Sequence, residues 1–342
     1  MKKAIIPLLA AIISGIPCSH AAHRQCFDNG WKFAFGNAAD PARDFGCGTE
    51  YFNYLTKANS ISNEGPYCNK FDPGRWGVEW TDVTLPHDWV VDLPFAPDAS
   101  HSHGYKTVGY KYPETSVGWY RKEFTVPAED YGKHISLQFD GIFRDSRVWV
   151  NGFYLGSEPS GYATQVYDIS EYLNYGGENI VAVRADATLE EGWFYEGAGI
   201  YRHVWLDKTD PLHVAPFGVF IHASLDDPFV EALVTVETTV DNKGLEAAGY
   251  EIRNTLVAPD GSRTTFPVQR VECLQAKDSR RSVSEATVKN PQLWDIDNPQ
   301  LYTLVTEIVR NGEITDTRIT RTGIRHIRFD GESGVLLSGR GV

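Results

Sequence analysis

Short segments of alternating hydrophobic and polar residues, separated by turn residues, run through most of this chain. Two of the turns are Asn-Gly pairs, at Asn151-Gly152 and Asn311-Gly312, each flanked by apolar segments. Such a pair is a strong signal for a two-residue β-hairpin, because both residues readily adopt the positive φ that the turn requires. Only residues 170–175 hint at a helical turn. We therefore expect an all-β protein with antiparallel sheets.

The strand-like segments fall into two groups with a break between them. Residues 208–216 contain two prolines at the end of one strand pattern, as is common in a linker between domains. The first group fits an antiparallel sandwich, and the second gives about seven strands in about 110 residues, as in an immunoglobulin-like sandwich. The segments are 27–35, 120–126, 135–139, 147–150, 153–155, 180–184 and 201–206 before the break, and 231–240, 250–257, 282–288, 301–309 and 314–320 after it.

Residues 37–75 interrupt the first group of strands. They are polar, rich in glycine, asparagine and aspartate, and without helical periodicity. Long loops normally lie on the surface, because burial would leave their backbone groups without hydrogen bonds. We expect residues 37–75 to form a surface insertion.

Length and composition narrow the class of protein. A chain of 342 residues has the length of two domains, and 42% hydrophobic residues suit a folded protein rather than a disordered one. The formal net charge of −13 argues against a nucleic-acid or anionic-membrane partner, because phosphates would be repelled. Aromatic residues reach 13%. Their rings can stack on sugars or fill a sandwich core, and composition leaves both open.

The first residues have the pattern of a targeting signal. Lys2 and Lys3 precede an apolar stretch over residues 4–16, and small residues follow at positions 19–21. We expect residues 1–21 to be a Sec signal peptide cleaved near Ala21 or Ala22, and the exported protein to be periplasmic or secreted.

A lipoprotein is the alternative at this end, through Cys18, but Ile16-Pro17 fits the lipobox poorly. The apolar stretch is too short to anchor the chain in a bilayer, and no other stretch is long enough to span one.

Export would place the remaining cysteines in an oxidising compartment. They are Cys26, Cys47, Cys68 and Cys273, and their spacing fits no zinc site. Cys47 and Cys68 flank one polar loop and are the favoured disulfide, which would contribute about 3 kcal/mol. Free buried thiols are the alternative.

Several short motifs follow one another in a fixed order. They are NGWKF (29–33), LPHDW (85–89), GWYRK (118–122), FDG (139–141), VWVNG (148–152), GAGIYR (197–202), PQLW (291–294), PQLY (299–302) and GIR (323–325). Each is weak alone, but the ordered set is specific. Over nearly all of residues 24–342, the chain resembles the non-catalytic N-terminal half of glycoside hydrolase family 2, especially β-galactosidases of the Bacteroidetes type.

This resemblance implies a domain plan. Residues 22–208 would form a jelly-roll, galactose-binding-like domain, and residues 212–326 an immunoglobulin-like β-sandwich. Residues 327–342 would begin the linker to a (β/α)8 barrel. In the family, two glutamates about 5–5.5 Å apart on that barrel carry out retaining hydrolysis. A barrel takes about 250 residues, so we expect it to be absent from this chain.

Without the barrel, we expect no catalytic residue in this chain and no hydrolysis by the chain alone. Asn63-Glu64 matches the dipeptide of the family's acid/base, but it lies in the polar insertion and is better explained as coincidence. The resemblance instead implies two substrate-binding residues, Asp88 and Asp186, on loops that reach the mouth of the barrel. A carboxylate suits this task because it accepts two hydrogen bonds from neighbouring hydroxyls. For both, a turn-capping role is the alternative.

Other candidate residues lie close to Asp186 in the sequence. Trp193, Phe194 and Tyr195 could contact sugar or could be core, and the sequence leaves this open. Glu190, Glu191 and Glu196 are interpreted as loop carboxylates. His101-Ser102-His103 is interpreted as a solvated loop rather than a metal site, since no third ligand is near. We predict no metal or cofactor in this chain, while a cation in the parent enzyme stays open.

The resemblance thus predicts the N-terminal portion of an exported retaining glycoside hydrolase acting on terminal β-galactosides. Its expected partners are a β-galactoside oligosaccharide or glycan and its own C-terminal barrel, with homo-oligomerisation left open. Three alternatives remain: a free-standing carbohydrate-binding module, a purely structural role, or a family 2 enzyme of other specificity, such as a β-glucuronidase or β-mannosidase.

Overall fold

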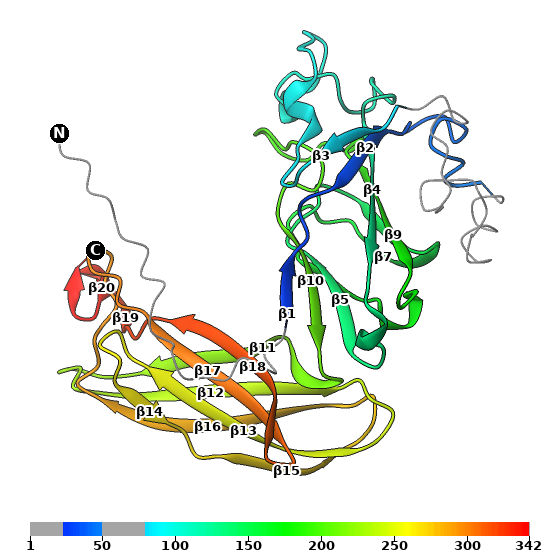
Figure 1. Ribbon diagram of the computed structural model, residues 1–342. Coiled ribbons are helices and arrows are strands. Elements are labelled where there is room, and N and C mark those ends of the chain that lie inside the picture. Colours follow the sequence, from blue (N-terminus) through cyan, green and yellow to red (C-terminus); the bar gives the residue numbers. More distant parts are fainter. Residues whose placement is uncertain (1–22, 50–78, 342) are drawn as a thin grey trace, which may run out of the picture. The chain divides into compact units, whose positions relative to one another are not determined.

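The computed structural model describes residues 23–49 and 79–341 and divides them into two compact units (Figure 1). The first comprises His23–Pro211, and the second begins at Leu212. We call them the jelly-roll unit and the immunoglobulin-like unit. Both are β-sandwiches, as predicted. The helical structure described is limited to short 3-10 turns, so no helix in these ranges could span a membrane.

The jelly-roll unit consists of two antiparallel sheets. The smaller sheet has the strand order β1 (His23–Cys26), β10 (Val204–Thr209), β5 (His134–Phe139) and β8 (Gln165–Asp168). The larger has the order β3 (Thr81–Val83), β2 (Trp31–Phe35), β4 (Val117–Thr125), β9 (Glu178–Asp186), β6 (Ser146–Val150) and β7 (Phe153–Glu158). The predicted hairpin at Asn151-Gly152 connects β6 to β7, with φ of 50° and 84°.

Both faces of the larger sheet are buried at its central strands, where successive side chains point to opposite faces. On β4, the neighbours Trp119 and Tyr120 point to opposite faces, since successive strand residues alternate, and both are fully buried. Tyr120 belongs to the main core between the sheets. Trp119 belongs to a smaller cluster on the other face, where it stacks on Trp149 at 5.5 Å between ring centroids.

Residues 41–48, at the start of the predicted insertion, complete this smaller cluster. Phe45 and Cys47 are buried in it, and Asp44 is only 3% exposed. Asp44 accepts hydrogen bonds from Trp119 Nε1 (2.6 Å) and Arg184 Nε (2.9 Å). The prediction of a surface insertion is therefore wrong for this part, because its apolar residues and one carboxylate pack on the sheet.

Cys47 lies in this packed segment, and burial raises the pKa of its thiol. No disulfide joins the cysteines within the described ranges, Cys26, Cys47 and Cys273. Cys68 lies outside those ranges, so its pairing with Cys47 stays a prediction.

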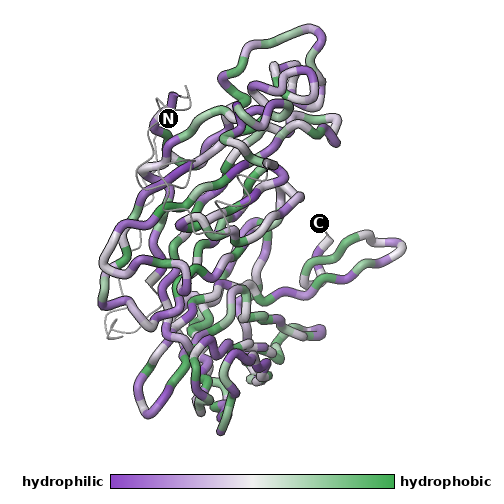
Figure 2. The backbone as a smooth tube through the Cα atoms, turned by 90° about the vertical axis from the view of Figure 1, so that its right-hand side faces the viewer, coloured by the Kyte–Doolittle hydropathy of each residue, from purple (hydrophilic) through white to green (hydrophobic). Residues whose placement is uncertain are grey.

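The immunoglobulin-like unit also consists of two main sheets. One is β11 (Leu212–Ser224), β12 (Glu231–Asn242) and β16 (Ser279–Lys289). The other has the order β14 (Arg263–Thr265), β13 (Ala248–Val257), β17 (Tyr302–Arg310) and β18 (Glu313–Thr322), and β15 (Gln269–Leu274) also pairs with β13. Buried and more exposed residues alternate along β13. Figure 2 shows hydrophobic and hydrophilic residues interleaved along the backbone.

A neutral polar network lies inside this sandwich. Asn254 Oδ1 accepts a hydrogen bond from Thr306 Oγ1 (2.7 Å), and Asn254 Nδ2 donates one to Ser284 Oγ (3.2 Å). Asn254 and Thr306 face each other across β13 and β17, while Ser284 is on β16 of the opposite sheet. All three are at most 4% exposed. The network therefore joins the two sheets through the core.

The last described strands form a separate small sheet. β19 (Ile327–Asp330) and β20 (Gly334–Leu337) make an antiparallel hairpin, and β21 (Arg340–Gly341) pairs with β20. The turn is held by Asp330 Oδ1, which accepts hydrogen bonds from the backbone of Glu332 and Ser333.

Candidate functional site

Two long loops meet at one end of the jelly-roll unit (Figure 1). Residues 84–116 connect β3 to β4, and residues 187–203 connect β9 to β10. Val117 pairs with Asp186, so β4 begins where β9 ends and the loops leave the sheet at the same edge. They are joined by hydrogen bonds from His87 N to Ile200 O (2.9 Å), Trp89 N to Ala198 O (3.2 Å), Glu196 N to Ser102 O (3.0 Å) and Ser102 Oγ to Gly192 O.

Asp88 holds these loops together with both of its carboxylate oxygens. Its Oδ1 accepts from Val90 N (3.0 Å), capping the 3-10 turn η2 (Trp89–Asp92), and from Ala198 N (2.9 Å). Its Oδ2 accepts from the Tyr195 hydroxyl (2.8 Å). The capping role considered from the sequence is therefore present. The structure also brings together two of the four predicted site residues.

The Tyr195 hydroxyl is the donor in this contact. Burial and the hydrogen bond to the Asp88 carboxylate raise the pKa of Tyr195 above its usual value. The phenol therefore stays protonated at neutral pH and donates a hydrogen bond to Asp88 Oδ2.

Asp186 ends β9 and is also committed to neighbouring groups. Its Oδ1 accepts from Thr188 N (3.0 Å) and Thr188 Oγ1 (2.5 Å), and its Oδ2 accepts from Arg184 Nη1 (3.2 Å). This is the Asx-type turn considered as the alternative, with an added ion pair. Its side chain keeps 20% of its surface exposed, so a hydroxyl could still reach it.

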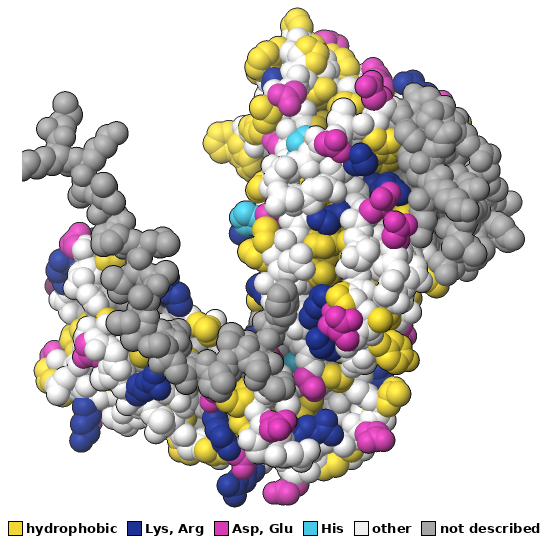
Figure 3. All heavy atoms as spheres, in the orientation of Figure 1, with side chains coloured by type: hydrophobic (Ala, Val, Ile, Leu, Met, Phe, Trp, Pro, Cys, Tyr) yellow, Lys and Arg dark blue, Asp and Glu magenta, His cyan; other side chains and the backbone are white. Residues whose placement is uncertain are grey.

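The aromatic residues after Asp186 face solvent. Trp193 is 85% exposed, Phe194 54% and Tyr195 46%. The core interpretation of these residues is therefore wrong, and their rings are available to a ligand. Hydrophobic side chains lie among acidic ones at this end of the unit in the space-filling view (Figure 3).

Negative charge is concentrated in the same loop. Four carboxylates fall within residues 186–196, and this stretch contains no lysine or arginine. Glu191 pairs with Arg144 (2.8 Å), which enters from another loop, and Glu196 accepts a hydrogen bond from Gly192 N (2.8 Å). Sequence reasoning did not anticipate Arg144, because its partner is 47 positions away and no local motif marks it.

The expectation of a solvated loop at residues 101–103 is correct for His101 and wrong for His103. His101 is exposed, whereas His103 is fully buried and its two ring nitrogens have no hydrogen-bond partner within the described residues. Burial lowers the pKa of His103, against the opposing effect of the Glu196 and Glu190 carboxylates. In the part of the chain that the structure describes, no three His, Cys, Asp or Glu side chains are grouped to hold a metal.

The described residues form sandwiches rather than a barrel. Asn63-Glu64, the dipeptide attributed to coincidence, lies outside the described residues. The loops present carboxylates and exposed aromatic rings, the kinds of group that contact the hydroxyls and the C–H faces of sugars.

Two family models match the chain in succession. The model for the sugar binding domain of glycosyl hydrolases family 2 covers residues 79–210, and a second model, glycosyl hydrolases family 2, covers residues 212–325. The β-galactosidase BoGH2A of Bacteroides ovatus is 37% identical over 269 residues, which are 78% of this chain. The chain belongs to glycoside hydrolase family 2.

Other members of family 2 differ in their named specificity. A putative β-glucuronidase of Formosa agariphila is 30% identical over 269 residues, or 77% of this chain. A crystal structure of a family 2 member from Bacteroides cellulosilyticus matches 93% of this chain with a TM-score of 0.76 and 28% identity. The match covers 31% of BoGH2A, 24% of the Formosa protein and 37% of the crystallised chain. The chain thus spans about a third or less of the curated relatives.

Proposed function

We propose that this chain is the substrate-contacting N-terminal portion of an exported retaining glycoside hydrolase that removes terminal β-linked galactose from oligosaccharides or glycans. The observation that carries the proposal is the linked pair of loops, in which Asp88 bonds to Tyr195 of the exposed aromatic segment 193–195, which follows Asp186 along the chain. The residues of the chemistry itself would lie on the family's barrel.

The carboxylates of this surface favour a neutral sugar over a uronic acid. A glucuronide brings a carboxylate towards Glu190 and Glu196, whereas Asp186 and Glu191 of the same stretch are offset by ion pairs with Arg184 and Arg144. Two like charges about 4 Å apart repel by about 4 kcal/mol near a protein surface. Galactose has only hydroxyls, which donate to carboxylates. The identity to BoGH2A supports the same choice.

Export rests on the signal-peptide pattern of residues 1–21, which lies outside the described residues. We propose a periplasmic or secreted location. N-terminal sequencing of the mature protein should begin near Ala22 or His23, and a retained Met1 or a lipid on Cys18 would contradict it.

The test compares this chain with the longer protein obtained when the chain is expressed together with a family 2 barrel encoded in the same reading frame. We expect no turnover of a chromogenic β-galactoside by the chain alone. The longer product should hydrolyse the galactoside much faster than the glucuronide. A preference for the glucuronide would overturn the proposed specificity.

Asp88→Asn is the matched variant in the longer product. It keeps the oxygen that caps Val90 and Ala198 but removes the charge. A substrate hydroxyl gains this charge-assisted hydrogen bond only by displacing the Tyr195 phenol, so its loss should lower kcat/KM by about tenfold at most. Asp82→Asn, an exposed aspartate on β3, should leave kcat/KM unchanged. Equal kinetics for wild type and Asp88→Asn would remove Asp88 from the substrate site.

A further inference from the structure

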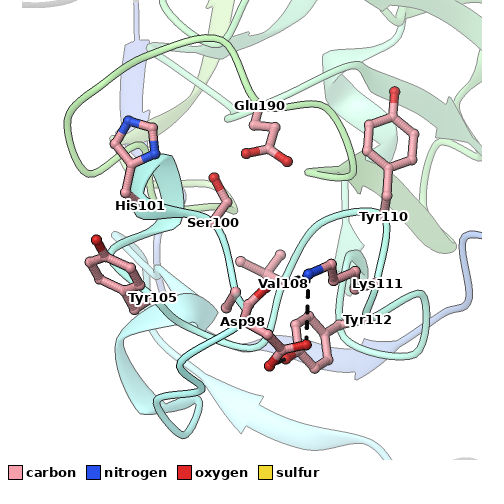
Figure 4. Close-up of a pocket in the computed structure, with 10 residues that line it drawn as sticks. Asp98, Ser100, His101, Tyr105, Val108, Tyr110, Lys111, Tyr112 and Glu190 are labelled. Carbon is pink, nitrogen blue, oxygen red and sulfur yellow. Dashed lines mark hydrogen bonds and ion pairs between the residues drawn. The ribbon is translucent and has the colours of Figure 1, made fainter.

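A pocket of about 440 Å³ lies between residues 98–112 and Glu190 (Figure 4). This volume is within the range of small-molecule sites, roughly 300–1,000 Å³. Its lining contains neither Asp88 nor Asp186. The residues around it are Asp98, Ala99, Ser100, His101, Tyr105, Val108, Tyr110, Lys111, Tyr112 and Glu190.

Two exposed tyrosine rings flank this pocket. Tyr105 is 53% exposed and Tyr110 is 64% exposed, and they lie on opposite sides in Figure 4. Tyr105 has φ of 59°, a left-handed conformation that is rare for a bulky residue. Backbone hydrogen bonds hold it there, from Tyr105 N to Ser100 O (2.9 Å) and from Ala96 N to Tyr105 O (2.8 Å). The ring is therefore displayed by a fixed backbone.

The base of the pocket is braced by a third tyrosine. The Tyr112 hydroxyl donates to Asp98 Oδ1 (2.8 Å), and Lys111 Nζ donates to Asp98 O (2.7 Å). Lys111 Nζ also lies 3.7 Å from Asp98 Oδ2. The positive charge of Lys111 thereby balances the negative charge of Asp98 at the base of the pocket.

Glu190 provides an uncommitted acceptor. Its carboxylate points toward the space between the rings (Figure 4). Within the described ranges, no hydrogen bond or ion pair engages it, whereas the neighbouring Glu191 is paired with Arg144. Ser100 Oγ accepts from Ser102 N (3.1 Å), which leaves the Ser100 hydroxyl proton free to be donated.

We propose that this pocket binds an uncharged hexopyranose unit of a glycan. The C–H face of a pyranose packs on an aromatic ring, its hydroxyls donate to Glu190, and a ring or hydroxyl oxygen accepts from Ser100. An anionic sugar would place its carboxylate against Glu190. This inference does not depend on the specificity proposed above, because its residues are different and it concerns binding alone.

The test is binding of lactose to the intact chain by saturation-transfer NMR, with calorimetry for Kd. We expect Kd in the millimolar range, and no measurable binding of glucuronic acid at the same concentration. Tyr110→Ala and Glu190→Gln should each weaken lactose binding by about tenfold. Tyr131→Ala is the matched control, since this tyrosine is 80% exposed outside the pocket and should leave Kd unchanged.

Asp88→Asn separates this proposal from the preceding one. Lactose binding that survives Asp88→Asn and is lost in Tyr110→Ala supports the pocket. Binding lost in Asp88→Asn but retained in Tyr110→Ala and Glu190→Gln overturns it. No lactose binding by the folded wild-type chain, or equal binding of glucuronic acid, also overturns it, whatever the longer enzyme hydrolyses.

Discussion

The two units are both β-sandwiches, but the first has long loops between its strands and the second has longer strands. The immunoglobulin-like unit has strands of up to 13 residues and includes a two-residue turn at Asn311-Gly312. The jelly-roll unit carries two long loops, 84–116 and 187–203, which hold Asp88, the exposed aromatics and the tyrosine pocket. This difference places the candidate site residues on the jelly-roll unit.

Each unit buries a polar group whose contacts lie within that unit. In the jelly-roll unit, an ion pair between Asp44 and Arg184 attaches a loop segment to the outer face of a sheet. In the immunoglobulin-like unit, the neutral network of Asn254 joins one sheet to the other. Removing Asp44 should therefore destabilise the first unit, and removing Asn254 the second.

The largest expected effect comes from Asp44→Ala. It leaves Arg184 Nε and the indole of Trp119 without an acceptor in a buried site, which costs about 3 kcal/mol, while Arg184 Nη1 keeps its ion pair with Asp186. Calorimetry should show the jelly-roll transition lowered by roughly 10 °C, with the immunoglobulin-like transition unchanged. Equal shifts in both transitions would contradict the independence of the two units.

Asn254→Ala should give the reverse pattern with a smaller effect. Thr306 and Ser284 would each lose a buried partner, at a cost of about 1–3 kcal/mol. The immunoglobulin-like transition should fall and the jelly-roll transition should stay in place. An effect below about 0.5 kcal/mol would show that the network contributes nothing beyond packing.

Asp88→Ala should destabilise the jelly-roll unit by about 1 kcal/mol, because η2 loses its cap. Asp88→Asn, which keeps the capping oxygen, should be close to wild type in urea unfolding. Equal losses in both variants would mean that the charge, not the cap, stabilises the loops.

The smallest effect concerns pH. Burial lowers the pKa of His103, and it lowers that of His87 as well. The unfolded chain therefore takes up these protons at a higher pH than the folded one. Stability is full above the unfolded pKa of about 6.5 and falls as the pH decreases below it.

His103→Leu isolates this effect. The melting temperature of the jelly-roll transition should drop less between about pH 7.5 and pH 5.5 in the variant than in wild type. Parallel pH profiles would show that folding does not change the pKa of His103.

Regular patterns made much of the fold predictable. Both hairpins with Asn-Gly turns and the alternating strands follow from local sequence, because each signal depends on neighbouring residues. The buried start of the insertion did not follow. Asp44 pairs with Arg184 across 140 positions, and a polar segment gives no local sign that one of its carboxylates will be buried.

The candidate site was predictable in part for the same reason. Asp88 and Asp186 were inferred from the resemblance, and Tyr195 from its neighbouring aromatics. Their contacts were not, since the Asp88–Tyr195 bond spans 107 positions. The burial of His103 was also missed, because a histidine between polar residues has the local pattern of an exposed loop.

The Asp88–Tyr195 hydrogen bond has a consequence for how tightly a sugar can be held. A hydroxyl that takes Asp88 Oδ2 must displace the Tyr195 phenol, so one donor is exchanged for another. The net gain is only the difference between two similar hydrogen bonds, while the released phenol must find solvent or the sugar itself as a new partner. Binding at Asp88 would thus add selectivity for a well-placed hydroxyl more than affinity.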